Sequence, residues 1–121
     1  MTKKIVRRLA EITGLDSRLE PEAGNGISLY PESTSVKERF CDGGMLASMK
    51  LRLRLKGRDP QLLFRTAENA CSAADSSDED TAVYRTFTPP ELEAGTEAGV
   101  YVVSCVIDAD YIREVSDEDS V

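Results

Sequence analysis

The segment 45–56 alternates apolar and cationic side chains with a period of two residues. Its odd positions from 49 carry Met49, Leu51, Leu53 and Leu55, and its even positions from 50 carry Lys50, Arg52, Arg54 and Lys56. This period predicts a strand with one buried face and one wet, basic face, because a helix would scatter the cations around its circumference. Four like charges in a row repel one another, so we expect acidic groups in this chain or in a partner to compensate them. The four cations are therefore the candidate interface residues.

Length and composition are typical of one domain. The chain has 121 residues, of which 40% are apolar, enough for one modest core. We expect a single domain over 1–112 and an acidic C-terminal tail over 113–121. No apolar run approaches the ~20 residues needed to cross a bilayer, and the charged N-terminus lacks the apolar core of a secretory signal. The sequence thus predicts a soluble, non-exported protein with no membrane partner.

The residue types that usually support catalysis or metal binding are scarce. Cys41, Cys71 and Cys105 are far apart and match no zinc spacing, and the chain contains no histidine. Free thiols in a reducing compartment are the simpler interpretation. Without histidine, the commonest general base and the usual catalytic triads are excluded. We therefore predict no catalytic residue, no metal site and no cofactor.

Charge is distributed unevenly along the chain. The net charge is −7, made up of +4 over residues 1–60 and −11 over residues 61–121. Such a division favours head-to-tail contacts between copies, in which a basic surface meets an acidic one. The acidic total argues against specific nucleic-acid binding, because phosphate would be repelled by much of the surface. We expect the cationic row to contact protein rather than a polyanion.

The pattern of apolar residues predicts two helices and about five strands. A glycine-rich turn at 41–44 joins two strands into a hairpin, and Asp59-Pro60 is a typical helix start. The run after Gly99 is β-branched and nearly continuously apolar, which predicts a central strand, whereas Pro89-Pro90 is expected to end the strand before it. The expected helices are 2–13 and 60–74, and the expected strands are 26–31, 34–40, 45–56, 81–88 and 100–107. The predicted fold class is α+β, a small mixed sheet with both helices packed on one face.

Four further segments bear on function. The alanines of the 60–74 helix favour close packing on the sheet over a helix–helix contact between copies. The acidic turn 75–80 lacks the spacing and glycine of a calcium loop, so we expect it to be solvated. The polar connections 14–25 and 89–98 are candidates for contacts with neighbouring proteins.

The order of these elements resembles a known family. An N-terminal helix precedes Gly26-Ile27-Ser28-Leu29-Tyr30-Pro31, and a strand then leads to the turn Asp42-Gly43-Gly44. The long alternating strand, the helix opened by Asp59-Pro60 and the late strand Gly99-Val100-Tyr101-Val102-Val103 complete the pattern. Over roughly residues 1–112 this is similar to the minor capsid or tail-terminator proteins of long-tailed bacteriophages.

The resemblance implies a structural virion protein that joins head and tail. Its subunits would form a homo-oligomeric ring, usually a hexamer, at the head-proximal end of the tail after assembly in the host cytoplasm. The implied partners are other copies of the chain, the tail tube protein and the head connector protein. Cyclic rings need a heterologous contact, in which one patch of each copy meets a different patch of the next. No individual functional residue is carried over from the family.

Three other functions stay open on the sequence alone. A head-closure or neck connector protein shares the same assembly logic. A small acidic inhibitor or immunity-type protein fits the acidic half of the chain, although the basic strand fits it poorly. An enzyme would have to use Asp108 and Asp110 together with Glu114, but adjacent acids after a strand are more often a solvated end.

Overall fold

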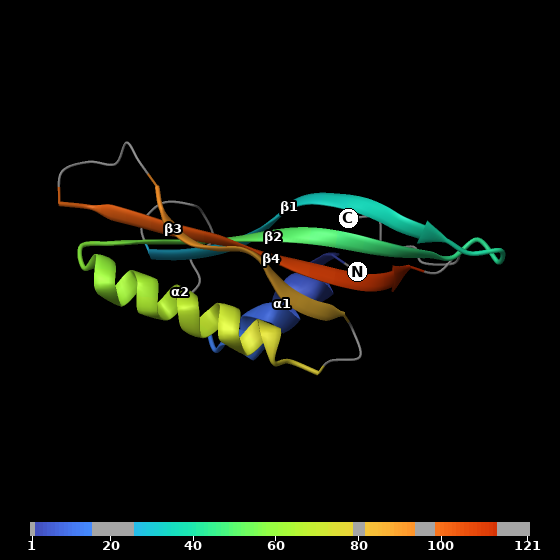
Figure 1. Cartoon of the computed structure of the whole chain (residues 1–121), viewed down its shortest axis with the longest axis horizontal. Coiled ribbons are helices and arrows are strands. Elements are labelled where there is room, and N and C mark those ends of the chain that lie inside the picture. The colour runs from blue at the N-terminus through green and yellow to red at the C-terminus, as the bar shows by residue number, and fades with distance from the viewer. Residues whose placement is uncertain (1, 16–25, 79–81, 94–98, 114–121) are drawn as a thin grey trace.

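The computed structural model describes residues 2–15, 26–78, 82–93 and 99–113. Within them the chain forms two helices and one four-stranded antiparallel sheet, with strand order β1-β2-β4-β3 (Figure 1). The elements are α1 (Thr2–Thr13), β1 (Gly26–Arg39), β2 (Met45–Gly57), α2 (Pro60–Asp75), β3 (Val83–Leu92) and β4 (Tyr101–Arg113). The α+β class with two helices is thus confirmed, and β4 is a central strand as predicted.

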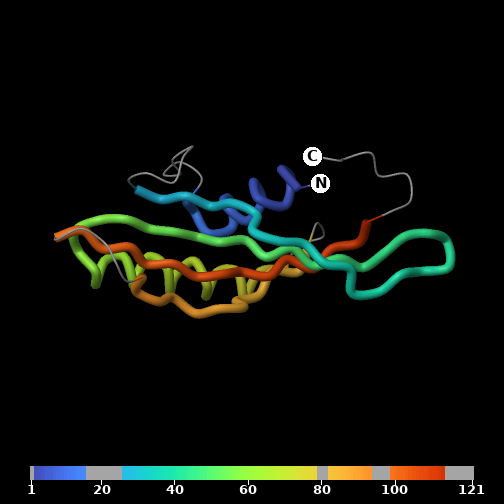
Figure 2. Tube along the Cα trace, turned by 90° about the horizontal axis from the view of Figure 1, so that it is seen from above, coloured from blue at the N-terminus to red at the C-terminus, as the bar shows by residue number. Residues whose placement is uncertain are grey.

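Both helices pack on the same face of the sheet and lie next to each other. In Figure 1 both helices lie below the sheet, and Figure 2 shows α1 near β1 and α2 near β3. The core has two apolar clusters: Ile5 and Leu9 of α1 pack with Met49 and Leu51, and α2 packs on the next part of β2 and β4. The predicted alternation of β2 is confirmed, because Met49, Leu51, Leu53 and Leu55 are all buried on this face.

Helix α2 begins where the sequence predicts. The Asp59 carboxylate accepts hydrogen bonds from the backbone N–H groups of Gln61 and Leu62 at 3.1 and 3.3 Å, which caps the first turn. Pro60 follows at the first helical position, where a missing N–H costs nothing. The buried stripe of the helix is Leu63, Ala67, Ala70, Cys71 and Ala74. Ala67, Ala70 and Ala74 therefore pack within this chain, as expected.

The first two predicted strands are one continuous strand. β1 runs from Gly26 to Arg39 through Pro31, and its pairing with β2 shifts register between Pro31 and Ser33 and again between Val36 and Glu38. β1 is an edge strand, so a proline N–H is not needed for a second ladder on its outer side. The register shifts accommodate the interruption that was predicted between residues 31 and 34. The described sheet therefore has four strands instead of about five.

β3 continues through the proline pair that was predicted to end it. The strand reaches Leu92, with register shifts on both sides of Thr88. The Asp75 carboxylate at the end of α2 accepts hydrogen bonds from the Thr86 backbone N–H at 2.6 Å and from its hydroxyl at 3.0 Å. The prolines are tolerated because β3 is the other edge of the sheet. The predicted loop 89–98 is thus wrong over 89–92.

Two smaller predictions also need correction. Each pair of neighbouring strands in the described residues is antiparallel, so the sheet is not mixed as predicted. β4 runs from Tyr101 to Arg113, so the last strand extends past its predicted end at residue 107. Most of the 14–25 connection, the end of the acidic 75–80 turn, residues 94–98 and the tail from 114 lie outside the described residues. No helix of the described ranges is long and apolar enough to span a bilayer.

Candidate interaction surface

The face of the sheet opposite the helices, called the open face here, carries the predicted cationic row. β4 pairs in register with β2, so the even-numbered side chains of both strands share this face. Lys50 lies opposite Asp108, Arg52 opposite Val106, and Arg54 opposite Ser104. The row is therefore one continuous line along β2, and no α-helix of the described structure covers it (Figures 1 and 2).

Three of the four cations have acidic partners within the chain. Lys50 pairs with Asp108 across the β2–β4 ladder, Nζ to Oδ1 3.1 Å. Arg52 reaches sideways to Glu32 on β1, with N–O distances of 2.7 and 3.3 Å. Arg54 bonds Glu93 just after β3 in the same two-pronged way, at 3.0 and 3.1 Å. The compensation expected from this chain or a partner is thus internal for these three.

The two arginine pairs shift the pKa values of their members. The hydrogen bond from Arg54 is the main cause that lowers the pKa of Glu93 below its ordinary value, with a smaller contribution from Ser104. Hydrogen bonding to Glu32 raises the pKa of Arg52, and hydrogen bonding to Glu93 raises the pKa of Arg54. Charged hydrogen bonds of this two-pronged kind are geometrically specific. They hold long side chains flat on the sheet and turn the basic row into a paired layer.

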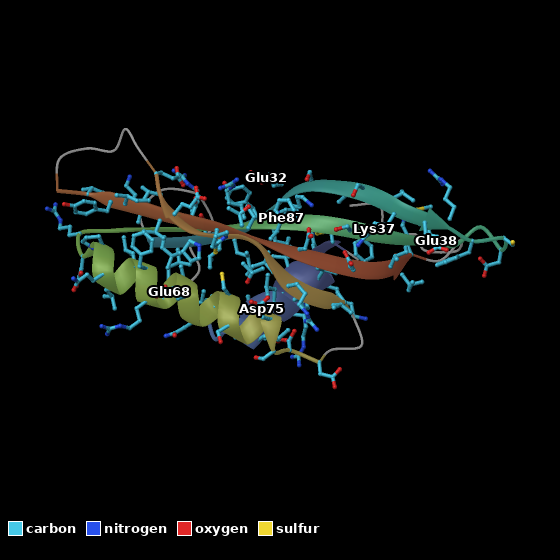
Figure 3. The ribbon with its side chains drawn as sticks, viewed as in Figure 1. Glu32, Lys37, Glu38, Glu68, Asp75 and Phe87 are labelled. Carbon is cyan, nitrogen blue, oxygen red and sulfur yellow. The ribbon has the colours of Figure 1, made fainter. Side chains whose placement is uncertain are left out.

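Large apolar side chains are also exposed on the open face, among the paired charges. Phe87 is 56% exposed, and the Lys50 ammonium lies 4.0 Å from the centre of its ring. Val83 and Ile112 are each 51% exposed, and the strand register places both on the open face. Figure 3 shows Phe87 and Glu32 on the sheet away from α2, whereas Glu68 and Asp75 lie along that helix. The open face thus combines paired charges with large exposed apolar groups.

The charges of the described residues on the open face balance. Its described residues include six cations and six carboxylates. The cations are Lys37, Lys50, Arg52, Arg54, Lys56 and Arg85, and the carboxylates are Glu32, Glu38, Glu91, Glu93, Asp108 and Asp110. Lys56 has no ion-pair partner among the described residues. A partner that docks here meets almost no net charge.

Both edges of the sheet are poorly suited to adding another strand. β1 carries Pro31 and two register shifts, and β3 carries Pro89, Pro90 and two register shifts. Prolines and bulges are the usual means by which edge strands avoid pairing with another chain. A contact between this domain and another protein is therefore better placed on the open face than along an edge.

The cationic row was predicted from the sequence, but the groups around it were not. Glu32 and Glu93 lie 20 and 39 residues from their arginines, so only the strand register brings them together. The sequence did offer one signal for Phe87, because it is a large aromatic residue among polar residues in a predicted strand. Asp108 and Asp110, the pair considered for an enzyme, instead form ion pairs with Lys50 and Lys37. Their third candidate, Glu114, lies outside the described residues.

Possible metal ligands and known relatives also bear on function. The described ranges contain no group of three or more histidine, cysteine, aspartate or glutamate side chains arranged to hold a metal ion. No family model matches the sequence, and no curated protein matches it significantly.

Proposed function

We propose that this chain is a structural subunit of a homo-oligomeric ring in a bacteriophage virion, where it terminates the tail tube and joins it to the head connector. The observation that carries this proposal is the open face, on which the charges of the described residues balance and large apolar side chains are exposed. Two copies of a chain with a net charge of −7 repel one another at long range. The open face adds no local excess of charge to that repulsion and exposes Phe87, Val83 and Ile112, so it is the surface through which we expect two copies to meet.

The layout of the domain supports assembly through this surface. Both helices are used to cover one face of the sheet, and the edges are protected by prolines and bulges. In a closed ring, the open face of each copy would meet a different patch of the next. Aromatic residues such as Phe87 are typical of the centre of protein interfaces. The resemblance in element order supplies the virion context of the proposal.

The test uses particles assembled without this protein. Phage produced from a genome that lacks the gene are imaged by electron microscopy, with plasmid-supplied protein as the restored control. Overlong tails that regain normal length on complementation are expected from a tail terminator. Tails of normal length that are detached from heads would instead assign a head-closure role. Fully normal particles would contradict any role in the virion and leave the inhibitor-type alternative.

A further inference from the structure

The outer side of helix α1 carries exposed cations, called the α1 cationic face here. Its residues are Lys3, Lys4 and Arg7, which are all exposed, whereas Ile5 and Leu9 on the opposite side of the helix are buried. None of the three cations forms a salt bridge with another residue of the described ranges. The α1 cationic face thus differs from the row on β2, where three of four cations are paired within the chain.

The cations of this face repel one another. Arg7 lies four residues after Lys3 and three residues after Lys4, and side chains at these spacings are neighbours on a helix. Like charges at such spacings destabilise the helix. The first turn of α1 contains no acidic residue that could offset them. A negatively charged segment placed against the face would relieve the repulsion.

The chain contains an acidic segment of matching charge directly after β4. Residues 114–121, which lie outside the described ranges, hold four carboxylates and no cation. The carboxylates are those of Glu114, Asp117, Glu118 and Asp119. Opposite charges of this kind steer two surfaces together and fix how they meet.

The fold brings the start of this segment close to α1. Tyr111 belongs to the same buried cluster as Ile5, and the Tyr84 hydroxyl, on the residue paired with Ala109, donates a hydrogen bond of 2.8 Å to the Ile5 carbonyl. Ala109 precedes Arg113 by four residues, a distance of about 13 Å along a strand. Eight extended residues reach about 27 Å, enough to return to the helix. In Figures 1 and 2, α1 begins toward the end of the sheet at which β4 finishes.

We propose that the α1 cationic face is a docking surface for an acidic peptide segment, and that its occupant is the segment 114–121 of the same chain. Because the segment is tethered beside the helix, its effective concentration at the face exceeds that of a free partner. The contact lies on the helix-covered side of the sheet. It therefore goes beyond the proposed function and does not depend on the open face.

The experiment places a nitroxide spin label on the acidic segment and reads its effect on α1 by nuclear magnetic resonance. The label is attached at Ser120→Cys in a Cys41→Ser background, in which Cys71 and Cys105 are buried. The amide signals of α1 residues 2–8 should broaden at low ionic strength, and those of α2 residues 61–68 should not. At about 1 M salt, where the Debye length falls to about 3 Å, the broadening of α1 should weaken.

Matched charge reversals separate docking from mere proximity of the label. Lys3→Glu with Arg7→Glu should reduce the broadening of α1 by about twofold or more, because attraction becomes repulsion. Arg58→Glu with Arg65→Glu changes the net charge by the same amount at two exposed positions away from α1 and should leave the broadening unchanged.

A rescue variant and a mixed sample complete the test. Adding Asp117→Lys and Glu118→Lys to the Lys3→Glu, Arg7→Glu variant should restore the broadening, which a misfolded helix would not allow. In a mixture of isotope-labelled chains without the spin label and spin-labelled chains without the isotope, α1 should stay sharp. The proposal is overturned if α1 stays sharp within one chain at low ionic strength, if both charge reversals act equally, if the rescue fails, or if the mixed sample broadens.

Discussion

The two faces of the sheet are built from the same strands but held by different forces. On the helix-covered face, consecutive odd positions of β2 bury Leu51 and Leu53 against α1 and α2. On the open face, Arg52 and Arg54 stay partly exposed and are held by ion pairs with acids from the two edges of the sheet. Apolar burial supplies most of the stability of a fold, whereas exposed ion pairs add little. The covered face therefore holds the domain together, and the open face is available for contacts.

The largest difference should appear between adjacent residues of β2. Leu51→Ala removes a fully buried side chain and should lower the free energy of unfolding by about 2–5 kcal/mol. Arg52→Ala removes the partly exposed ion pair with Glu32 and should lower the free energy of unfolding by about 1 kcal/mol or less. Urea unfolding followed by circular dichroism measures both. Equal costs would mean that the two faces are not energetically distinct.

A smaller effect is expected where α1 is tied to the sheet. The Tyr84 hydroxyl donates a buried hydrogen bond of 2.8 Å to the Ile5 carbonyl. Tyr84→Phe keeps the ring but removes this bond, so the free energy of unfolding should fall by about 1 kcal/mol. Tyr30→Phe, on the open face, is the control and should change little. If the control were as costly as Tyr84→Phe, the hydrogen bond would not be a specific anchor of α1.

The pair between Arg54 and Glu93 should make part of the stability pH-dependent. Folding lowers the pKa of Glu93 below its ordinary 4.5, so the pair's contribution is complete above that value. It is lost as the pH falls through the lower folded pKa. Because the pair is a third exposed, Glu93→Gln should cost about 1 kcal/mol or less at neutral pH. At about pH 3 the gap between the two proteins should narrow.

The same acid titration needs a carboxylate without an ion pair as its control. Glu68→Gln, on the exposed side of α2, removes one acid that forms no salt bridge within the described structure, and its effect should be nearly the same at both pH values. A constant gap between wild type and Glu93→Gln across the titration would show that the pair contributes nothing to folding.

These predictions use features that differ in how far the sequence could reveal them. The bounds of α1 and the position of β2 follow from local periodicity and capping, which depend on a few neighbouring residues. The fusion of 26–31 with 34–40 and the passage of β3 through Pro89 and Pro90 depend on being at a sheet edge, which only the tertiary pairing decides. For the same reason, the row of cations was visible but its partners Glu32 and Glu93 were not.

The smallest effect on folding is expected at the unpaired end of the row. Lys56 has no salt bridge among the described residues, so Lys56→Gln should change the free energy of unfolding by no more than about 0.5 kcal/mol. Urea unfolding of this variant beside Arg54→Gln checks whether pairing, rather than charge alone, separates the members of the row. A larger loss for Lys56→Gln than for Arg54→Gln would reverse that order.

The central claim, that copies meet through the open face, is tested most directly by sedimentation velocity over a range of concentrations. Phe87→Glu places a charge on the open face, and Leu62→Glu places one at a similarly exposed apolar position on α2. We predict that the wild-type chain and Leu62→Glu associate into larger species as concentration rises, whereas Phe87→Glu stays monomeric. Association of Phe87→Glu equal to that of the wild type, or a wild-type chain that is monomeric at every concentration, would contradict the claim.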